Sequence, residues 1–200
     1  LFRNAMKNVA ALGDKYEIFM DELERNFRLE QYLEQLIDLD ETCTKASENT
    51  RYTEWGSDLT EALAGVFKRV ALEAPDLFAP GAQRKSDFFR DIAGSQYSTI
   101  SEEVAKEADT PFDVLLNIYD RSIIDVENRI YTETTNQNLM RALDRTLVNL
   151  PDLAPVADEV RTEVQKELGI DLEETYVIGT GYGRARLPFS KDHIRSEILC

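Results

Sequence analysis

The sequence predicts a mainly α fold, a multi-helix array that carries one β-strand and one further helix at its C-terminal end. Apolar residues recur at intervals of three and four over most of residues 1–170, which is the period of an α-helix. Helix-starting and helix-ending residues separate these stretches. A β-branched and aromatic run with closely spaced glycines appears only near residue 175. We therefore expect a helical insertion domain at 1–154 and a second segment of helix, strand, glycine turn and helix at 155–200.

Composition limits the classes of protein that this chain can belong to. It has 23 Lys and Arg residues against 38 Asp and Glu residues, a formal net charge of −15. Such an acidic chain repels phosphate backbones, so we expect no nucleic-acid partner. No stretch approaches the ~20 apolar residues of a membrane-spanning helix. The two cysteines, Cys43 and Cys200, are too few for a disulfide framework and favour a reducing compartment, so we expect a cytoplasmic protein.

The first helix is expected from Asp14 onward, with two successive apolar stripes. The change from one stripe to the next predicts either a bend near Arg28 or a helix that is buried on two sides. The run from Thr42 to Thr53 is rich in Thr, Ser and Asn and predicts a loop leading to Trp55. The stripes consist of Tyr16, Phe19, Met20, Leu23 and Phe27, followed by Leu29, Leu33, Leu36 and Ile37.

The second helix is expected to begin at an N-cap, Ser57, and to stop at Pro75. Its apolar face would comprise Leu59, Leu63, Val66, Phe67 and Val70. Pro80 and Gly81 predict the turn that follows.

Two short helices should come next, one ending at Gly94 and another beginning near Ser98 or Ser101. Thr110 then predicts an N-cap with Pro111 at the first helical position. The seam behind it is formed by Phe112, Leu116, Tyr119, Ile123, Val126 and Ile130. Its spacing of four and three is typical of a helix that packs against another helix, and we consider it as a contact surface for a second subunit.

Two further helices complete the helical part. A polar run from Thr132 to Asn138 interrupts the pattern, and Pro151 ends the helix that follows the run. The last helix is expected from Pro155 to Gly169. The apolar residues of these helices are Leu139, Leu143, Leu147 and Leu150 in the first, and Val156, Val160, Val164 and Leu168 in the second. We interpret the stripes of this array as core and the acidic faces as solvated surface.

The C-terminal stretch has a different character. Thr175 to Ile178 predicts a short buried strand, whose backbone groups need ladder partners that are absent from this chain or supplied by another chain. Alternate glycines after the strand let the backbone come close to a ligand or another chain, and the residues between them offer hydroxyls and a guanidinium. Taken alone, the same pattern also fits a plain turn. The residues concerned are Gly179, Thr180, Gly181, Tyr182, Gly183 and Arg184.

The order of these C-terminal motifs resembles a known family. Tyr176 to Arg184 is followed by Pro188 and Phe189, and then by Ser196-Glu-Ile-Leu-Cys200. This string is similar to the ATP-hydrolysing activator subunits of 2-hydroxyacyl-CoA dehydratases and of ATP-dependent benzoyl-CoA reductases. The resemblance covers residues 156–200. Residues 1–154 look like the helical insertion of the large ATPase subunit of benzoyl-CoA reductase.

The resemblance implies an activity, cofactors and partners. Cys200 matches one thiolate ligand of a [4Fe–4S] cluster held between two ATPase subunits. Gly179, Thr180, Gly181, Tyr182, Gly183 and Arg184 match a loop of an actin-like ATPase core near that interface. In the family, hydrolysis of ATP, bound with Mg, changes the angle between the two subunits. This change drives an electron from reduced ferredoxin to the acyl-CoA-reducing subunits. The partners implied are a second ATPase subunit, identical or different, those acyl-CoA-reducing subunits and ferredoxin.

The chain also departs from the family pattern. It has no Asp-x-Gly-Ser phosphate loop, no second Asp-Gly-Gly loop and no second cluster cysteine. We therefore assign no ATP contact or catalytic residue, and expect these residues alone to be inactive and to hold no cluster. The start at Leu1 without a methionine suggests a segment of a longer protein. The alternative is a free-standing helical protein–protein interaction module without catalysis.

Four further side chains are candidates for chemistry. Cys43 is expected to be a free thiol in a polar loop. His193, the single histidine, is expected on the surface of the last helix. Trp55 with Tyr52 is expected to fill a helix junction rather than to bind a ligand.

Overall fold

The computed structural model describes residues 3, 6, 7, 9–83, 86–129, 131 and 134–168, the last two of these by their backbone. Those residues form helices and turns without a strand, so the mainly α prediction is confirmed for them. The strand expected at 175–178, the glycine turn and the final helix lie outside the described residues. The chain falls into two compact units, Leu1–Glu163 and Val164–Cys200. The helices are α2 (Tyr16–Ser47), α3 (Gly56–Leu77), α4 (Phe89–Glu107), α5 (Phe112–Glu127), α6 (Thr135–Asn149) and α7 (Ala157–Leu168), with 3-10 turns η1 (Ala10–Lys15), η2 (Thr50–Tyr52) and η4 (Pro151–Val156).

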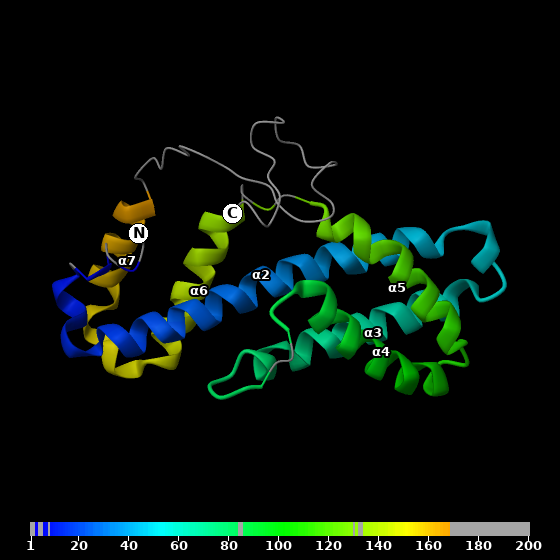
Figure 1. Cartoon of the computed structure of the whole chain (residues 1–200), viewed down its shortest axis with the longest axis horizontal. Helices are drawn as coiled ribbons and strands as arrows, with labels where there is room; N and C mark the ends of the chain where they lie inside the picture. Colours follow the sequence, from blue (N-terminus) through cyan, green and yellow to red (C-terminus); the bar gives the residue numbers. More distant parts are fainter. Residues whose placement is uncertain are drawn as a thin grey trace, which may run out of the picture. The chain divides into compact units, whose positions relative to one another are not determined.

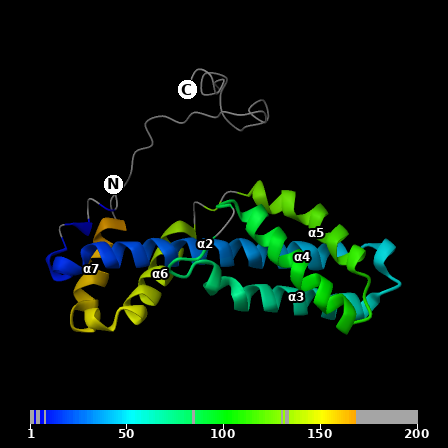
Figure 2. The same cartoon turned by 60° about the horizontal axis from the view of Figure 1, so that its bottom comes forward.

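Helix α2 is the spine of the first unit. Its 32 residues correspond to a length of about 48 Å. Helices α3, α4 and α5 lie along one half of α2, and α6 lies along the other half (Figures 1 and 2). The helix continues without a break at Arg28, so the shift between its two apolar stripes reflects burial on two sides and not a bend. One prediction on this helix was wrong: Ile37 is exposed.

The loop predicted from Thr42 was also wrong, because α2 continues to Ser47. The hydroxyl of Thr42 donates to the Asp38 carbonyl at 2.6 Å, and that of Ser47 donates to the Thr44 carbonyl at 2.6 Å. Such back-bonding lets polar residues stay in a helix instead of capping its end. Cys43, fully buried between them, anchors this last part of α2 in the core.

Helix α3 differs from its prediction at both ends. It begins at Gly56 with Trp55 in the cap position, and Ser57 caps nothing because its hydroxyl donates to Asp58. Pro75 lies inside the helix, which ends two residues later at Leu77. A proline in the last turn removes one intrahelical hydrogen bond, which the packed end of the helix tolerates. The turn predicted at Gly81 is present, with φ +79°.

Helix α4 is continuous from Phe89 to Glu107, so the predicted pair of short helices was wrong. Gly94, Ser98 and Ser101 all lie inside it. The N-cap of α5 is Pro111 and not Thr110, so the helix begins one residue later than expected. Thr110 does not cap this helix, since its hydroxyl donates backward to the Ala108 carbonyl at 3.3 Å.

The seam predicted on α5 packs inside the chain's own bundle. Tyr119, Ile123 and Val126 are buried, whereas Phe112 and Leu116 are half-buried. The last seam residue, Ile130, lies outside the described residues. The buried face also includes Leu115 and Ile118, which the seam omitted. The buried members of the seam, Tyr119, Ile123 and Val126, therefore belong to the interior of the bundle.

The later helices agree more closely with expectation. Leu139, Leu143 and Leu147 are buried on α6, as predicted. The helix starts at Thr135, inside the polar run that was expected to interrupt it. Pro155 lies in η4, and α7 begins two residues after it.

One contiguous stretch of sequence supplies the main core. This term denotes the cluster of buried apolar residues from Leu29 to Val126, contributed by α2, η2, α3, α4 and α5. Among the described residues, the buried side chains of η1, the first turns of α2, and α6 fall outside it. The first unit thus contains two interiors that share α2.

Candidate functional site

The residues that the sequence nominates for chemistry fall mainly outside the described part of the chain. Gly179, Thr180, Gly181, Tyr182, Gly183, Arg184, His193 and Cys200 all belong to this group. Their roles therefore stay predictions. Within the described residues, no group of three or more His, Cys, Asp or Glu side chains could hold a metal ion.

Cys43 is a free thiol, as expected, but it lies in the core instead of a loop. Burial raises the pKa of its thiol to about 12, although Ser122 interacts with the sulfur and opposes the shift. The thiol is therefore protonated at neutral pH. Because iron–sulfur clusters and nucleophilic catalysis both require the thiolate, Cys43 suits neither role.

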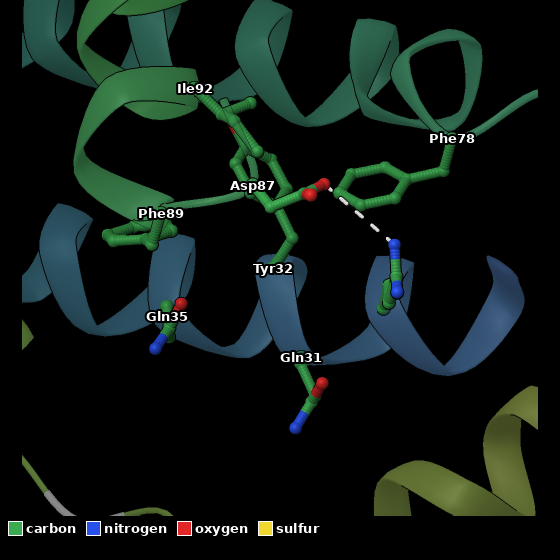
Figure 3. Close-up of a pocket in the computed structure, with 8 residues that line it drawn as sticks. Gln31, Tyr32, Gln35, Phe78, Asp87, Phe89 and Ile92 are labelled. Atoms are coloured by element: carbon green, nitrogen blue, oxygen red, sulfur yellow. Dashed lines mark ion pairs between the residues drawn. The ribbon is translucent and has the colours of Figure 1, made fainter. Parts of the chain in front are cut away.

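A concave site of about 300 Å³ lies between α2 and the start of α4. We call it the aromatic groove. Tyr32 lies between Phe78 and Phe89 (Figure 3). The centroid of its ring is 5.6 Å from that of Phe78 and 5.5 Å from that of Phe89. Its lining residues are Arg28, Gln31, Tyr32, Gln35, Phe78, Asp87, Phe89 and Ile92. Two distant parts of the sequence build this site, because the turn after α3 brings α4 back onto α2.

Among the described residues that line the aromatic groove, Arg28 and Asp87 carry the charge. Arg28 on α2 and Asp87 before α4 approach to 3.8 Å, and both side chains are largely exposed (Figure 3). Gln31 and Gln35 add neutral amides one helical turn apart on α2. An exposed pair of this kind contributes little to stability and orients polar groups weakly.

The phenol of Tyr32 does not supply acid–base chemistry to the groove. Its hydroxyl is buried and finds no hydrogen-bond partner among the described residues. Burial raises the pKa of this phenol above its ordinary value, so it stays neutral. The described lining of the groove therefore presents an aromatic face with a polar rim, which can bind a ligand, and it includes no activated nucleophile.

The sequence contained a partial signal for this groove. Phe88 and Phe89 follow a turn, and Phe88 is 75% exposed beside the site. Arg28, Gln31 and Gln35 share one helical face, which identifies a possible polar edge. Their approach to Phe78 depends on how α3 and α4 pack, and the local pattern does not encode it.

Tyr52 fills the junction between α2 and α3, as expected. This side chain is buried, and its hydroxyl lies 2.9 Å from the Asn117 amide oxygen on α5, to which it donates. Trp55 packs 6.3 Å away, centroid to centroid. These contacts link the junction to α5, which is a structural role.

The comparisons with known proteins add no further assignment. None of the described helices is long and apolar enough to cross a membrane. No protein-family model, curated protein or solved structure matches this chain.

Proposed function

We propose that the chain is part of an ATP-driven electron-activating subunit of an acyl-CoA reductase of the benzoyl-CoA reductase type. One observation carries the proposal: the order and spacing of Tyr176 to Arg184, Pro188-Phe189 and Ser196 to Cys200. A strand that leads into alternating glycines, followed at this distance by a Ser-Glu-Ile-x-Cys segment, is more specific than any of its parts.

The proposal gives each C-terminal element a role. Cys200 would be one ligand of a [4Fe–4S] cluster shared with a second ATPase subunit, and the bound cluster would supply one-electron transfer. The loop from Gly179 to Arg184 would belong to an actin-like ATPase core near that subunit boundary. Its glycines allow close backbone approach, and Arg184 offers a guanidinium to an anion. Ferredoxin would be the electron donor, and acyl-CoA-reducing subunits the acceptor.

The described helices support a scaffolding role within such a subunit. Cys43 is protonated and buried, and the aromatic groove holds no activated nucleophile. Catalysis would therefore belong to residues outside the helical array. The compartment that we propose is the cytoplasm, on the basis of the two cysteines, which form no disulfide framework.

The test compares two cysteine variants of the gene product that contains this sequence. After anaerobic reconstitution with iron and sulfide in the presence of the second ATPase subunit, Cys200→Ser should lose the broad visible absorption of the cluster. Cys43→Ala is the matched control, because it removes the other thiol, and it should keep that absorption. A Cys200→Ser protein that retains the cluster would contradict the proposal.

The second candidate function is a helical protein–protein interaction module. The observation in its favour is the exposed Phe88 beside the aromatic groove, since exposed aromatic side chains are enriched at interfaces. A reading frame that continues past Cys200 into an Asp-Gly-Gly loop supports the enzyme, and a stop codon supports the module.

A further inference from the structure

A groove of about 570 Å³ lies where three helices of the first unit meet. One wall is the first half of α2, the second is α6, and the third is the end of α3 with the turn that follows it (Figure 2). We call it the three-helix groove. Its lining residues are Glu22, Arg25, Asn26, Leu29, Pro75, Asp76, Phe78, Ala79, Pro80, Asp144, Arg145, Val148 and Asn149.

Each of the three helices exposes a large apolar side chain on the face that walls this groove. Val148 of α6 lines the groove and is 79% exposed. Leu72 of α3 is 69% exposed one turn before Asp76, and Ile18 of α2 is 61% exposed one turn before Glu22. Residues four positions apart share a helix face, so both side chains border the lining. Exposed apolar side chains that gather around a concave site indicate an interaction surface.

The floor of the groove is formed by its most buried lining residues. Leu29 and Phe78 are more than nine-tenths buried. Asn26 is buried to the same degree, and its amide donates to Glu22 at 3.3 Å and to Thr146 at 3.0 Å. An apolar partner can therefore cover the floor without leaving the amide hydrogens of Asn26 unpaired.

One carboxylate of the groove is free to pair with a partner's cation. The other charged lining residues are in ion pairs within the protein. These pairs are Arg25 with Glu22, Arg145 with Glu30, and Asp144 with Arg161. Asp76 has no such partner among the described residues. It lies near the end of α3, whose last turn has no basic residue. Because the C-terminal end of a helix carries partial negative charge, this position favours a cation.

The shape of the groove fits an α-helix. Its α2 wall from Ile18 to Leu29 is about 17 Å long, which corresponds to three helical turns. The described walls are helices and a turn, so they offer no strand edge to which an extended peptide could add. A helix brings its own backbone hydrogen bonds and can lay one apolar face into the groove.

We propose that the three-helix groove is the docking site for an amphipathic helix of a partner protein, with an apolar face of about three turns flanked by Lys or Arg. The apolar face would cover Leu29 and Phe78, and a basic residue beside it would pair with Asp76. A second copy of this chain fits less well, because two chains of formal charge −15 repel each other. The inference goes beyond the function proposed for the C-terminal segment and does not rest on it.

Labelled synthetic peptides, added to the 200-residue chain, test the proposal. The probe is an amphipathic Leu/Lys helix with leucines at every third and fourth position. A scrambled peptide of the same composition has no apolar face, and a third peptide has glutamate in place of each lysine. In fluorescence anisotropy, the probe should bind about tenfold more tightly than either of the others. Added salt should weaken its binding, because salt screens the attraction to Asp76.

Neutral substitutions separate a specific site from general attraction between unlike charges. Val148→Ser and Leu72→Ser remove apolar contacts without a change in charge, and each should weaken binding of the probe about fivefold. Ile124→Ser is the matched control, because Ile124 is an exposed apolar residue on α5 that does not line the groove. It should bind the probe like the unmodified chain. Asp76→Asn should weaken binding of the probe and reduce its salt dependence.

The outcomes distinguish the possible occupants. Equal binding of the probe and the scrambled peptide, or equal losses in Leu72→Ser and Ile124→Ser, would overturn the proposal. Sedimentation of the chain without peptide tests the other occupant, since a dimer that Val148→Ser dissociates would assign the groove to a second copy and overturn the proposal as well. None of these measurements involves Cys200 or the loop from Gly179, so their failure and that of the proposed function are distinguishable.

Discussion

Gly94 on α4 faces the hydroxyl of Tyr119 on α5 so closely that a Cβ at position 94 would lie 2.9 Å from the Tyr119 oxygen. The same hydroxyl lies 3.1 Å from the Arg90 carbonyl, one turn earlier on α4, and donates to it. The Tyr119 ring stacks on Tyr97 at 4.7 Å and cannot easily retreat. The glycine therefore permits a close contact between two helices inside the main core.

Gly94→Ala should destabilise the protein by about 1 to 2 kcal/mol, because overpacking of a core outweighs the better helix propensity of alanine. Gly65→Ala is the matched control inside α3. Its new Cβ would meet only Val104, at an ordinary 3.8 Å, so this variant should be stabilised by up to about 1 kcal/mol. Urea unfolding of both variants measures the difference.

Tyr119→Phe should rescue Gly94→Ala. The next ring atoms lie 3.6 Å and 3.7 Å from the added Cβ, which are normal contact distances once the oxygen is gone. In the wild-type background, Tyr119→Phe should cost about 1 kcal/mol for the lost hydrogen bond to Arg90. A double-mutant cycle with no favourable coupling would refute the close contact.

Two buried tyrosines should respond differently to loss of their hydroxyls. Tyr32→Phe should be neutral or stabilising, since its buried oxygen has no partner among the described residues. Tyr97→Phe should cost about 1 kcal/mol, because its hydroxyl donates to the Leu115 carbonyl at 3.1 Å. Chemical denaturation distinguishes the two variants, and equal losses would argue against the assigned hydrogen bonds.

Cys43 should be inert in the native protein. In the Cys200→Ser chain, Ellman's reagent at pH 8 should label no thiol before urea is added and one thiol afterwards. Burial raises the folded pKa of this thiol to about 12. The protonated Cys43 thiol therefore stabilises the folded protein fully below the unfolded pKa of about 8.5. This stabilisation is lost as pH rises toward 12. Rapid labelling without denaturant would show that Cys43 is accessible.

Glu22 should make the packing of α6 on α2 sensitive to acid, because its carboxylate accepts a hydrogen bond from Asn149 at 2.6 Å. Burial tends to raise the pKa of this carboxyl, but hydrogen bonds from Asn149, Arg25 and Asn26 outweigh it and lower the pKa below the usual range. The stabilisation is present above the unfolded pKa of about 4.3 and disappears as pH falls through the lower folded value. Asn149→Ala should raise the pKa of Glu22 in a carboxyl NMR titration.

Asn128→Ala is the control for this titration. Asn149 is the last residue of α6 and Asn128 is the first residue after α5, but the side-chain amide of Asn128 donates to the Ile124 carbonyl and not to a carboxylate. The pKa of Glu22 should be unchanged in Asn128→Ala. An equal shift in both variants would show that Asn149 has no specific role.

The sequence predicted elements best where apolar periodicity and tertiary burial agree. Leu139, Leu143 and Leu147 are such a case, since a stripe at intervals of four is also the buried face of α6. The prediction failed where one residue type fits two structural roles. Gly94 was interpreted as a helix end, yet its reason is the neighbouring Tyr119, which no local pattern reveals.

The candidate sites also differ in how far the sequence predicts them. The roles of Cys200 and of the loop from Gly179 are predicted from a linear motif, and these residues lie outside the described part of the chain. The aromatic groove and the hydrogen bonds between α2 and α6 join residues far apart in the chain, with Glu22 and Asn149 separated by 127 positions. Spacing along one helix shows which residues share a face, but the face opposite depends on packing.

The placement of the two interiors sets an expected order of folding. All residues of the main core come from the continuous stretch between Leu29 and Val126, so their contacts close short loops. The interior around α6 must instead bring the two ends of this stretch together, at a larger entropic cost. A fragment from Arg28 to Asn128 should therefore fold autonomously and quickly, and the remainder should condense on it in a later, slower kinetic phase.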